Sequence, residues 1–155
     1  MPRKFLVVVD DSPEFSAALR YASRRARSTG GRVALLRVLQ PSAEDYFPGV
    51  RDELESQMRR EAEALLRRLG EEAEARSGAT PEFLIQVGEP KGAIKAAVAA
   101  DPDIKILVLA AAVGGRGPGP LVGSIAKDGA GFGGRKLPVT VVPGDLTDEE
   151  IEDLA

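Results

Sequence analysis

Five short apolar runs, separated by segments of helical periodicity, constrain the fold of this chain more than any other feature. The runs do not alternate between polar and apolar residues, which is typical of strands buried on both faces. Between them, apolar residues recur at intervals of three or four, as in helices that bury one face. Strands that alternate with helices indicate βαβ units, right-handed crossovers and a parallel sheet. The predicted strands are Phe5–Val9, Val33–Leu39, Phe83–Val87, Ile104–Leu109 and Leu137–Val142.

Start and stop signals predict the helices between these strands. Ser12 followed by Pro13 is typical of an N-cap and a first helical position, and Gly30-Gly31 ends the helix that follows. A turn at Gly88-Glu89-Pro90 starts another helix, which Asp101-Pro102-Asp103 ends. The other predicted segments are an irregular loop over Pro41–Gly49, a long helix over Val50–Arg76, a short helix over Leu121–Asp128 and a flexible connection over Gly129–Gly134.

The length of 155 residues fits one domain, which we expect to span residues 1–145. Residues 146–155 form an acidic tail, and its Thr147-x-x-Glu150 pattern predicts a capping box and a short helix. The chain has no cysteine and no histidine, which excludes disulfides, the usual zinc sites and acid–base catalysis by histidine. A net charge of −3 argues against a nucleic-acid partner. No stretch is long and apolar enough for a signal peptide or a membrane span, so we expect a cytoplasmic protein with no membrane partner.

Two loops of the predicted sheet suit a ligand site. Ligands of such sheets bind beyond the carboxyl ends of the strands, where the strand order reverses. Asp10–Pro13 follows the first strand, and Ala110–Ser124 follows the fourth. The second loop is rich in glycine and proline, and Gly123-Ser124 opens the predicted helix after it. Because the first N–H groups of a helix have no partner within it and the helix dipole favours negative charge there, this loop is a candidate anion-binding site.

Five short motifs follow one another along the chain, namely Val9-Asp10-x-Ser12, Leu35-Leu36-Arg37-Val38, Gly88-x-Pro90, Gly123-Ser124 and Pro138-Val139-x-Val141-Val142. In this order and spacing they resemble the universal stress protein family over nearly the whole chain. The resemblance implies a three-layer, doubly wound α/β sandwich of the adenine nucleotide alpha hydrolase-like type, with a five-stranded parallel sheet of order 3-2-1-4-5. It also implies a cytoplasmic stress-response regulator that binds an adenine nucleotide such as ATP or AMP, with Mg²⁺ only when nucleotide is bound.

The phosphate loop keeps the spacing of the family but not its residues. In nucleotide-binding members, a glycine follows strand four, a second glycine comes after two residues, and Gly-Ser or Gly-Thr follows nine residues later. Here Ala110 and Val113 stand at the two glycine positions before Gly123-Ser124. If the second position requires a positive φ, valine is strongly disfavoured there. The loop therefore cannot simply copy the conformation found in the family.

An alternative register places the glycines at Gly114-Gly115-Arg116-Gly117, with only five residues left before Gly123. Arg116 could then make a charge-assisted contact with a phosphate. The first register is favoured because it preserves the length of the strand and the start of the helix.

The resemblance implies that the strand-one aspartate and the backbone at the end of strand two hold the base and the sugar. The alternative for Asp10 and Asp11 is that they only begin a turn and cap a helix, and for Val38 that it is a plain core residue. We identify no catalytic residue and no metal ligand. The candidate binding residues are Asp10, Asp11, Ser12, Val38, Ala110, Gly114, Gly115, Arg116, Gly117, Gly123 and Ser124.

Three functional hypotheses follow. The first is a homodimeric nucleotide-linked regulator, in which the resemblance implies pairing of the strand over Leu137–Val142 with its copy in a second subunit. The alternative for that strand is that the acidic C-terminal helix covers it. The second hypothesis is a dimeric member that binds no nucleotide and acts through protein–protein contacts, as the replacements at Ala110 and Val113 suggest. The third is an enzyme acting on an adenylated or phosphorylated compound, against which the absent histidine and cysteine count.

Overall fold

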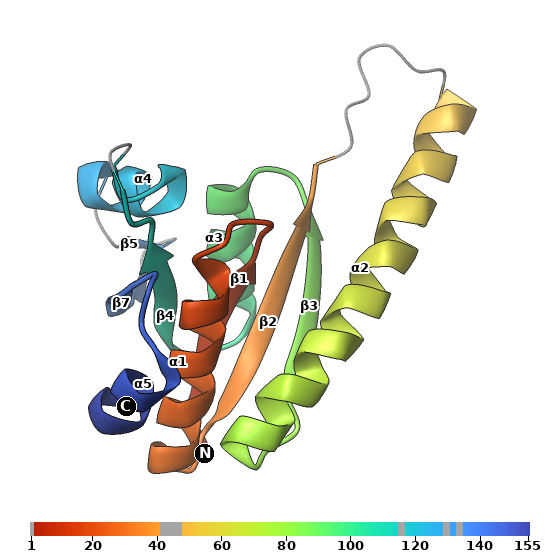
Figure 1. Ribbon diagram of the computed structural model, residues 1–155. Helices are drawn as coiled ribbons and strands as arrows, with labels where there is room; N and C mark the ends of the chain where they lie inside the picture. The colour runs from red at the N-terminus through yellow and green to blue at the C-terminus, as the bar shows by residue number, and fades with distance from the viewer. Residues whose placement is uncertain (1, 41–47, 115–116, 129–130, 133–134) are drawn as a thin grey trace.

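A five-stranded parallel sheet forms the centre of the computed structural model, which describes residues 2–40, 48–114, 117–128, 131–132 and 135–155 (Figure 1). The strand order is β3-β2-β1-β4-β7, so the predicted order of the five strands is confirmed, with β7 as the fifth predicted strand. The two edge strands of the sheet are therefore β3 and β7. The strands are β1 (Lys4–Val9), β2 (Arg32–Leu39), β3 (Glu82–Val87), β4 (Ile104–Ala111) and β7 (Val139–Pro143).

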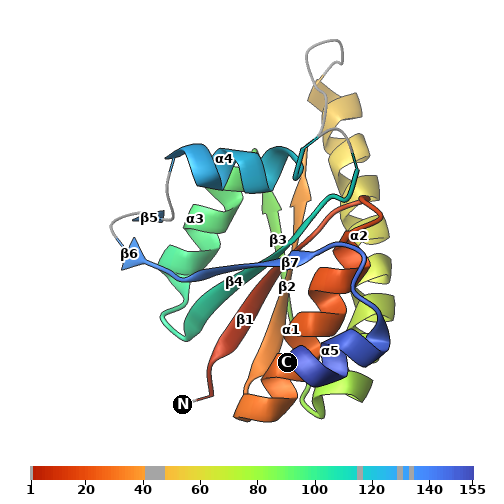
Figure 2. The ribbon, with the colours of Figure 1, turned by 60° about the vertical axis from the view of Figure 1, so that its left-hand side comes forward.

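Helices cover both faces of the sheet and complete the predicted three layers (Figure 2). Residues of β1 alternate between two buried clusters: Phe5, Val7 and Val9 pack with α1 and α2, and Leu6 and Val8 pack with α3 and α4. This packing on both faces explains why the strand sequence is continuously apolar. The helices are α1 (Phe15–Thr29), α2 (Pro48–Ser77), α3 (Pro90–Ala100), α4 (Pro120–Asp128) and α5 (Asp148–Leu154).

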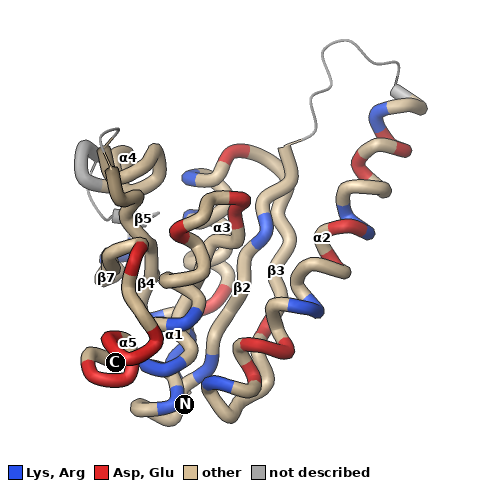
Figure 3. The backbone as a smooth tube through the Cα atoms, in the orientation of Figure 1, with Lys and Arg blue, Asp and Glu red and all other residues tan. Residues whose placement is uncertain are grey.

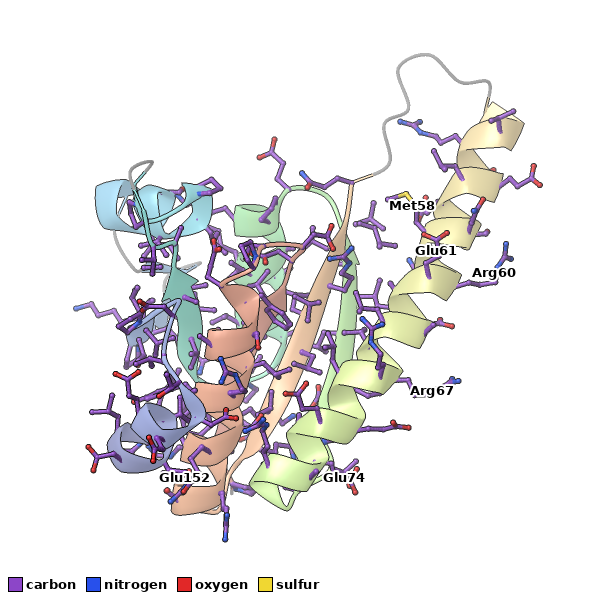
Figure 4. The ribbon with its side chains drawn as sticks, viewed as in Figure 1. Met58, Arg60, Glu61, Arg67, Glu74 and Glu152 are labelled. Carbon is purple, nitrogen blue, oxygen red and sulfur yellow. The ribbon has the colours of Figure 1, made fainter. Side chains whose placement is uncertain are left out.

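The long helix α2 lies on the sheet with its C-terminal part, while its N-terminal part extends beyond the sheet (Figure 1). Leu66 and Ala73 are buried in the core. Arg60 and Arg67 point away from the sheet, whereas Met58 points toward it (Figure 4). The charged residues of α2 therefore form a solvated face, as helical amphipathicity leads one to expect.

The starts of two helices differ from the sequence prediction. Ser12 does not cap α1, which begins at Phe15 after the N-cap Glu14. The reason is local, because the Ser12 N–H and Oγ donate to Oδ1 of Asp10 at 2.9 and 2.5 Å and form a side-chain turn instead. Helix α4 begins at Pro120, so Gly123 and Ser124 lie inside this helix rather than at its start.

The connection predicted over Gly129–Gly134 contains the first strand of a small antiparallel pair, β5 (Gly131–Phe132) and β6 (Arg135–Lys136). In the predicted loop over Pro41–Gly49, residues 41–47 lie outside the described residues, and Pro48 and Gly49 already belong to α2. Where residues are described, no helix is both long enough and apolar enough to cross a membrane.

The C-terminal tail forms α5, which lies beside α1 (Figures 1 and 2). The predicted capping box is present: Thr147 Oγ1 accepts from the N–H of Glu150 at 3.2 Å, and Glu150 Oε1 accepts from the N–H of Thr147 at 3.0 Å. The ion pairs of α5 join it to α1 and α2, with Asp148 2.6 Å from Arg20 and 3.6 Å from Arg76. Val141 of the edge strand β7 stays 44% exposed.

Candidate functional site

A cavity of about 280 Å³ lies where β1 and β4 end, between the loop after β1 and the start of α4. This is the position where the strand order reverses, as predicted for the two candidate loops. Its walls combine apolar core side chains, among them Phe15 and Val108, with the polar groups of the β1–α1 loop. The polar or backbone groups at its rim belong to Asp10, Asp11, Ser12, Glu14, Ala110, Gly119 and Pro120.

A second cavity, of about 470 Å³, lies on the other side of Asp10, between the starts of α3 and α4. Asp10 and Pro120 line both cavities, so the two are parts of one cleft. Ser124 lines only the second cavity. The lining of the second cavity also includes three polar residues that the sequence analysis did not select as binding residues, namely Gln40, Glu89 and Lys91.

The carboxylate of Asp10 is held by its own loop. Oδ1 accepts the two hydrogen bonds from Ser12, and within the described part of the chain Oδ2 accepts none. Asp10 therefore begins a turn, as one alternative predicted, but neither Asp10 nor Asp11 caps α1. The orientation leaves one carboxylate oxygen for a donor from a ligand, such as a sugar hydroxyl.

Arg37 and Asp11 form an ion pair beside the cleft. Nη2 of Arg37 lies 3.5 Å from Oδ1 of Asp11, and Nη1 donates to the carbonyl of Val9 at 3.1 Å. Because the side chain of Asp11 is 88% exposed, this pair contributes little to stability. The neighbouring Val38 packs its side chain against the core and lines neither cavity of the cleft, so that its contribution could come only from its backbone.

The loop after β4 turns at its glycines. Gly114, Gly117 and Gly119 have φ values of 126°, 80° and 105°, and no described residue other than glycine has a positive φ. Val113 is therefore unstrained, and its side chain is 65% exposed. Ala110 lies inside β4, opposite Val142, and borders the first cavity. Gly115 and Arg116 lie outside the described residues.

The first turn of α4 decides which N–H groups face the cleft. The N–H of Gly123 donates to the carbonyl of Gly119 at 2.9 Å, so it is already used within the helix. Pro120 has no N–H, which leaves the amides of Leu121 and Val122 as the helix-start donors. A Cβ added at Gly123 would meet no atom within 4 Å, so packing within the described chain does not require glycine there.

Glu14 also lines the cleft, although the sequence analysis did not select it. A Cβ added at Gly144 would lie 2.5 Å from the Cβ of Glu14 and 2.5 Å from the carbonyl oxygen of Ala111, so only glycine fits there. On the other side, a Cβ added at Gly119 would lie 3.8 Å from Oε1 of Glu14. The carboxylate of Glu14 therefore lies next to the start of α4.

Acidic residues dominate the described lining of the cleft. Figure 3 shows acidic positions, in red, on the backbone where β1 leads into α1. Asp10, Asp11, Glu14 and Glu89 line one or both cavities, and Lys91 is their one described cationic neighbour in that lining. No cluster of three or more carboxylate side chains with a geometry for a metal ion is found among the described residues. The cleft thus offers many acceptors for hydroxyl and amine donors, and few charges for a phosphate.

Comparisons with known proteins find one matching protein family and several solved structures of similar fold. The model of the universal stress protein family matches residues 1–130. The universal stress protein UspA from Lactobacillus plantarum superposes with a TM-score of 0.71 at 22% identity, over 90% of this chain and 97% of that chain. A comparison with curated protein sequences finds no match.

Two further similar structures were solved with nucleotides. The universal stress protein from Archaeoglobus fulgidus in complex with dAMP superposes with a TM-score of 0.55 at 22% identity, over 92% of this chain and 98% of that chain. A universal stress protein in complex with cAMP gives a TM-score of 0.63 at 18% identity, over 93% of this chain and 98% of that chain. At these identities the similarity concerns the fold.

Proposed function

Because the chain belongs to the universal stress protein family, we propose that it is a cytoplasmic stress-response regulator that binds an adenine nucleotide in the cleft around Asp10. The observation that carries the proposal is the meeting of two cavities at one strand-end carboxylate, where the strand order reverses. The cavity volumes of about 280 and 470 Å³ are of the size that holds small molecules in proteins. Two similar proteins, solved with dAMP and cAMP, support an adenine nucleotide as the ligand class.

In this proposal, Asp10 accepts a hydrogen bond from a ribose hydroxyl through its unused oxygen, and the Ser12 turn keeps the carboxylate in place. The amides at the start of α4 and the Ser124 hydroxyl are donors for a phosphate oxygen. The remaining proposed contacts are backbone groups of Asp11, Val38, Ala110, Gly114, Gly115 and Gly117, together with the side chain of Arg116. The N–H of Gly123 is used within α4, so Gly123 is not among these contacts. Mg²⁺ enters only with a bound nucleotide.

Calorimetry of the purified protein with ATP, ADP and AMP, with and without Mg²⁺, tests the proposal. We expect saturable binding that Asp10→Ala and Ser124→Ala both weaken, because each variant removes a proposed contact of the ligand. Circular dichroism checks that both variants remain folded. The absence of heat with every adenine nucleotide, in folded protein, would contradict the proposal. We expect at most slow hydrolysis, since no general base or metal cluster has been identified in the cleft among the described residues.

A second candidate function is a module that binds no nucleotide and acts through protein contacts. Ala110 and Val113, at the two positions that are glycine in nucleotide-binding members, favour it. Restoring both with Ala110→Gly and Val113→Gly separates the two functions. A gain of nucleotide binding only in the double variant would indicate that the natural loop has lost this activity.

We propose for either function that the protein is a homodimer joined through residues 137–142. The supporting observation is that β7 is an edge strand with an exposed Val141, while α5 forms its ion pairs with α1 and α2. Light scattering should give the mass of a dimer, and Val141→Lys should give that of a monomer. A monomeric mass for the unaltered chain would contradict the dimer.

A further inference from the structure

The end of α4 that would attract a phosphate already has a carboxylate of the protein beside it. Glu14 is the N-cap residue of α1, yet its side chain makes no capping hydrogen bond there. Its carboxylate instead lies next to Gly119, the residue before the first helical residue Pro120. Because a helix start carries a partial positive charge, Glu14 lowers the attraction of this helix end for a second anion.

Close packing fixes Glu14 in that place. Gly144 lies against the Cβ of Glu14, and the N–H of Gly144 donates to the carbonyl of Ala111 at 2.9 Å. The side chain is half-buried and leads from α1 across the cavity rim toward α4. The close contact of Gly144 therefore fixes the backbone and Cβ of Glu14, from which the carboxylate extends to the start of α4.

The rest of the cavity adds negative charge. Asp10 and Asp11 line the same cavity as Glu14, and its described lining contains no lysine or arginine. Two of its rim residues are Pro118 and Pro120, which have no N–H to offer. Among the described residues, a triphosphate here would meet the carboxylates of Asp10 and Glu14, together with Asp11, whose charge Arg37 offsets in part across 3.5 Å. A nucleoside would meet acceptors for its hydroxyls and an apolar wall that includes Phe15 for its base.

The described lining of the second cavity repels an anion less strongly than that of the first. Lys91 lines it together with Ser124 and Gln40. Its described lining has two carboxylates, Glu89 and Asp10, against three in the first cavity, and one cation among them does not balance the charge of a triphosphate.

We propose that the cleft selects adenosine and adenine nucleotides with one phosphate over ATP, because the Glu14 carboxylate stands in for an anion at the start of α4. This inference rests on the proposed function and names the ligand class of the same cleft. Glu14 acts here as a specificity-determining residue, with Asp11 as a weaker second contributor because its side chain is mostly exposed.

Calorimetry with adenosine, AMP, ADP and ATP, without divalent cations and at several salt concentrations, tests the order of affinities. We expect the unaltered protein to bind AMP more tightly than ADP, and ADP more tightly than ATP. The difference should shrink as salt is added, because salt screens repulsion between charges. Glu14→Gln should reduce the preference for AMP over ATP roughly fivefold, and Asp11→Asn roughly twofold.

Glu63→Gln on the exposed face of α2 is the matched control, since it removes the same charge away from the cleft. It should leave the preference unchanged. Circular dichroism checks whether Glu14→Gln folds. If it does not, Asp11→Asn still tests the selectivity, because Asp11 forms only an exposed ion pair and its substitution should not affect folding.

The outcomes separate the two proposals. ATP binding at least as tightly as AMP, or an effect of Glu14→Gln no larger than that of Glu63→Gln, would overturn the selectivity while nucleotide binding itself stood. No binding of adenosine or of any nucleotide would overturn both.

Discussion

The two ends of the central sheet use the same kinds of charged residues in opposite ways. At the end where the strands begin, Lys4 contacts Glu82 and lies 2.5 Å from Asp101, so that one cation joins two carboxylates. At the end where the strands finish, Asp10 and Glu14 line a cavity with no described cation in its lining. The charges at the first end are paired and half-buried. At the second end the pair of Asp11 with Arg37 is exposed, and among the described residues Asp10 and Glu14 form no ion pair.

Arg135 contacts backbone carbonyl groups at the end where the strands begin. It donates from one nitrogen to the carbonyls of Val98 and Asp101 at 2.6 and 3.0 Å, and from the other to those of Pro102 and Ile104. Arg135 thereby satisfies the carbonyl of Val98 in the last turn of α3. By contrast, the N-cap residues of α1 and α3 at the cleft, Glu14 and Glu89, make no side-chain capping bond. The comparison teaches that the first end stabilises the fold, while the second keeps polar groups that the proposed ligand could contact.

The largest effect on stability is expected from Arg135→Met. The substitution keeps an apolar stem but leaves several half-buried carbonyls without donors, at a cost of about 3 kcal/mol in the free energy of unfolding. Urea unfolding followed by circular dichroism measures this loss. The affinity of the cleft for nucleotide should not change, and a loss of both together would show that the two ends are not independent.

Lys4→Met should cost about 2 kcal/mol, because it leaves Glu82 and Asp101 without their shared cation. It should also alter the pH dependence of stability. Burial raises the pKa of Asp101, but hydrogen bonds from Lys4 and from the Asp103 N–H outweigh it, so the pKa of Asp101 lies below its ordinary 3.8. Burial likewise lowers the pKa of Lys4, and the bonds to Asp101 and Glu82 leave it above 10.5.

The signs of these two shifts set the expected profile. The stability from Asp101 is present above pH 3.8 and is lost as the pH falls through its lowered pKa. The stability from Lys4 is present below pH 10.5 and is lost as the pH rises through its raised pKa. Unfolding free energies measured between about pH 5 and about pH 3 should therefore fall less steeply in Lys4→Met than in the unaltered chain. Equal slopes would count against the ion pair.

A smaller difference is expected between two helix starts. Thr147→Ala removes the capping box of α5 and should cost about 1 kcal/mol. Glu89→Ala at the start of α3, where no capping bond exists, should cost well under about 0.5 kcal/mol. Thermal unfolding of both variants checks the contrast. A comparable loss in each would mean that the start of α3 is capped as firmly as that of α5.

The smallest effect is expected from Asp11→Asn. The pair with Arg37 spans 3.5 Å and the Asp11 side chain is 88% exposed, so the substitution should change the unfolding free energy by less than about 0.5 kcal/mol. Asp101→Asn, the matched change at the opposite end of the sheet, should cost more, because Asp101 is hydrogen-bonded to both Lys4 and the Asp103 N–H. Parallel urea titrations of the two variants measure both losses of stability. Equal losses would contradict the difference between the two ends of the sheet.

Much of the fold could be predicted because its signals are local. The continuous apolar run at Phe5–Val9 indicated burial on both faces, and β1 indeed alternates between two core clusters. The Thr147 capping box needs only residues three positions apart in the chain, and it forms as predicted. The predicted start of α1 was wrong because two local interactions compete for the Ser12 side chain. The turn with Asp10 forms in place of the helix cap.

The sequence by itself determined the order of the elements and the meeting of the loops after β1 and β4, because periodicity and the rules for parallel sheets act over short stretches. Only the tertiary structure decided the charge of the cleft. Glu14 reaches α4 because Gly144, far away in the chain, allows a close approach, and Lys91 lines the same cleft from α3. Such contacts depend on distances across the folded chain, which the spacing of residues along the sequence does not encode.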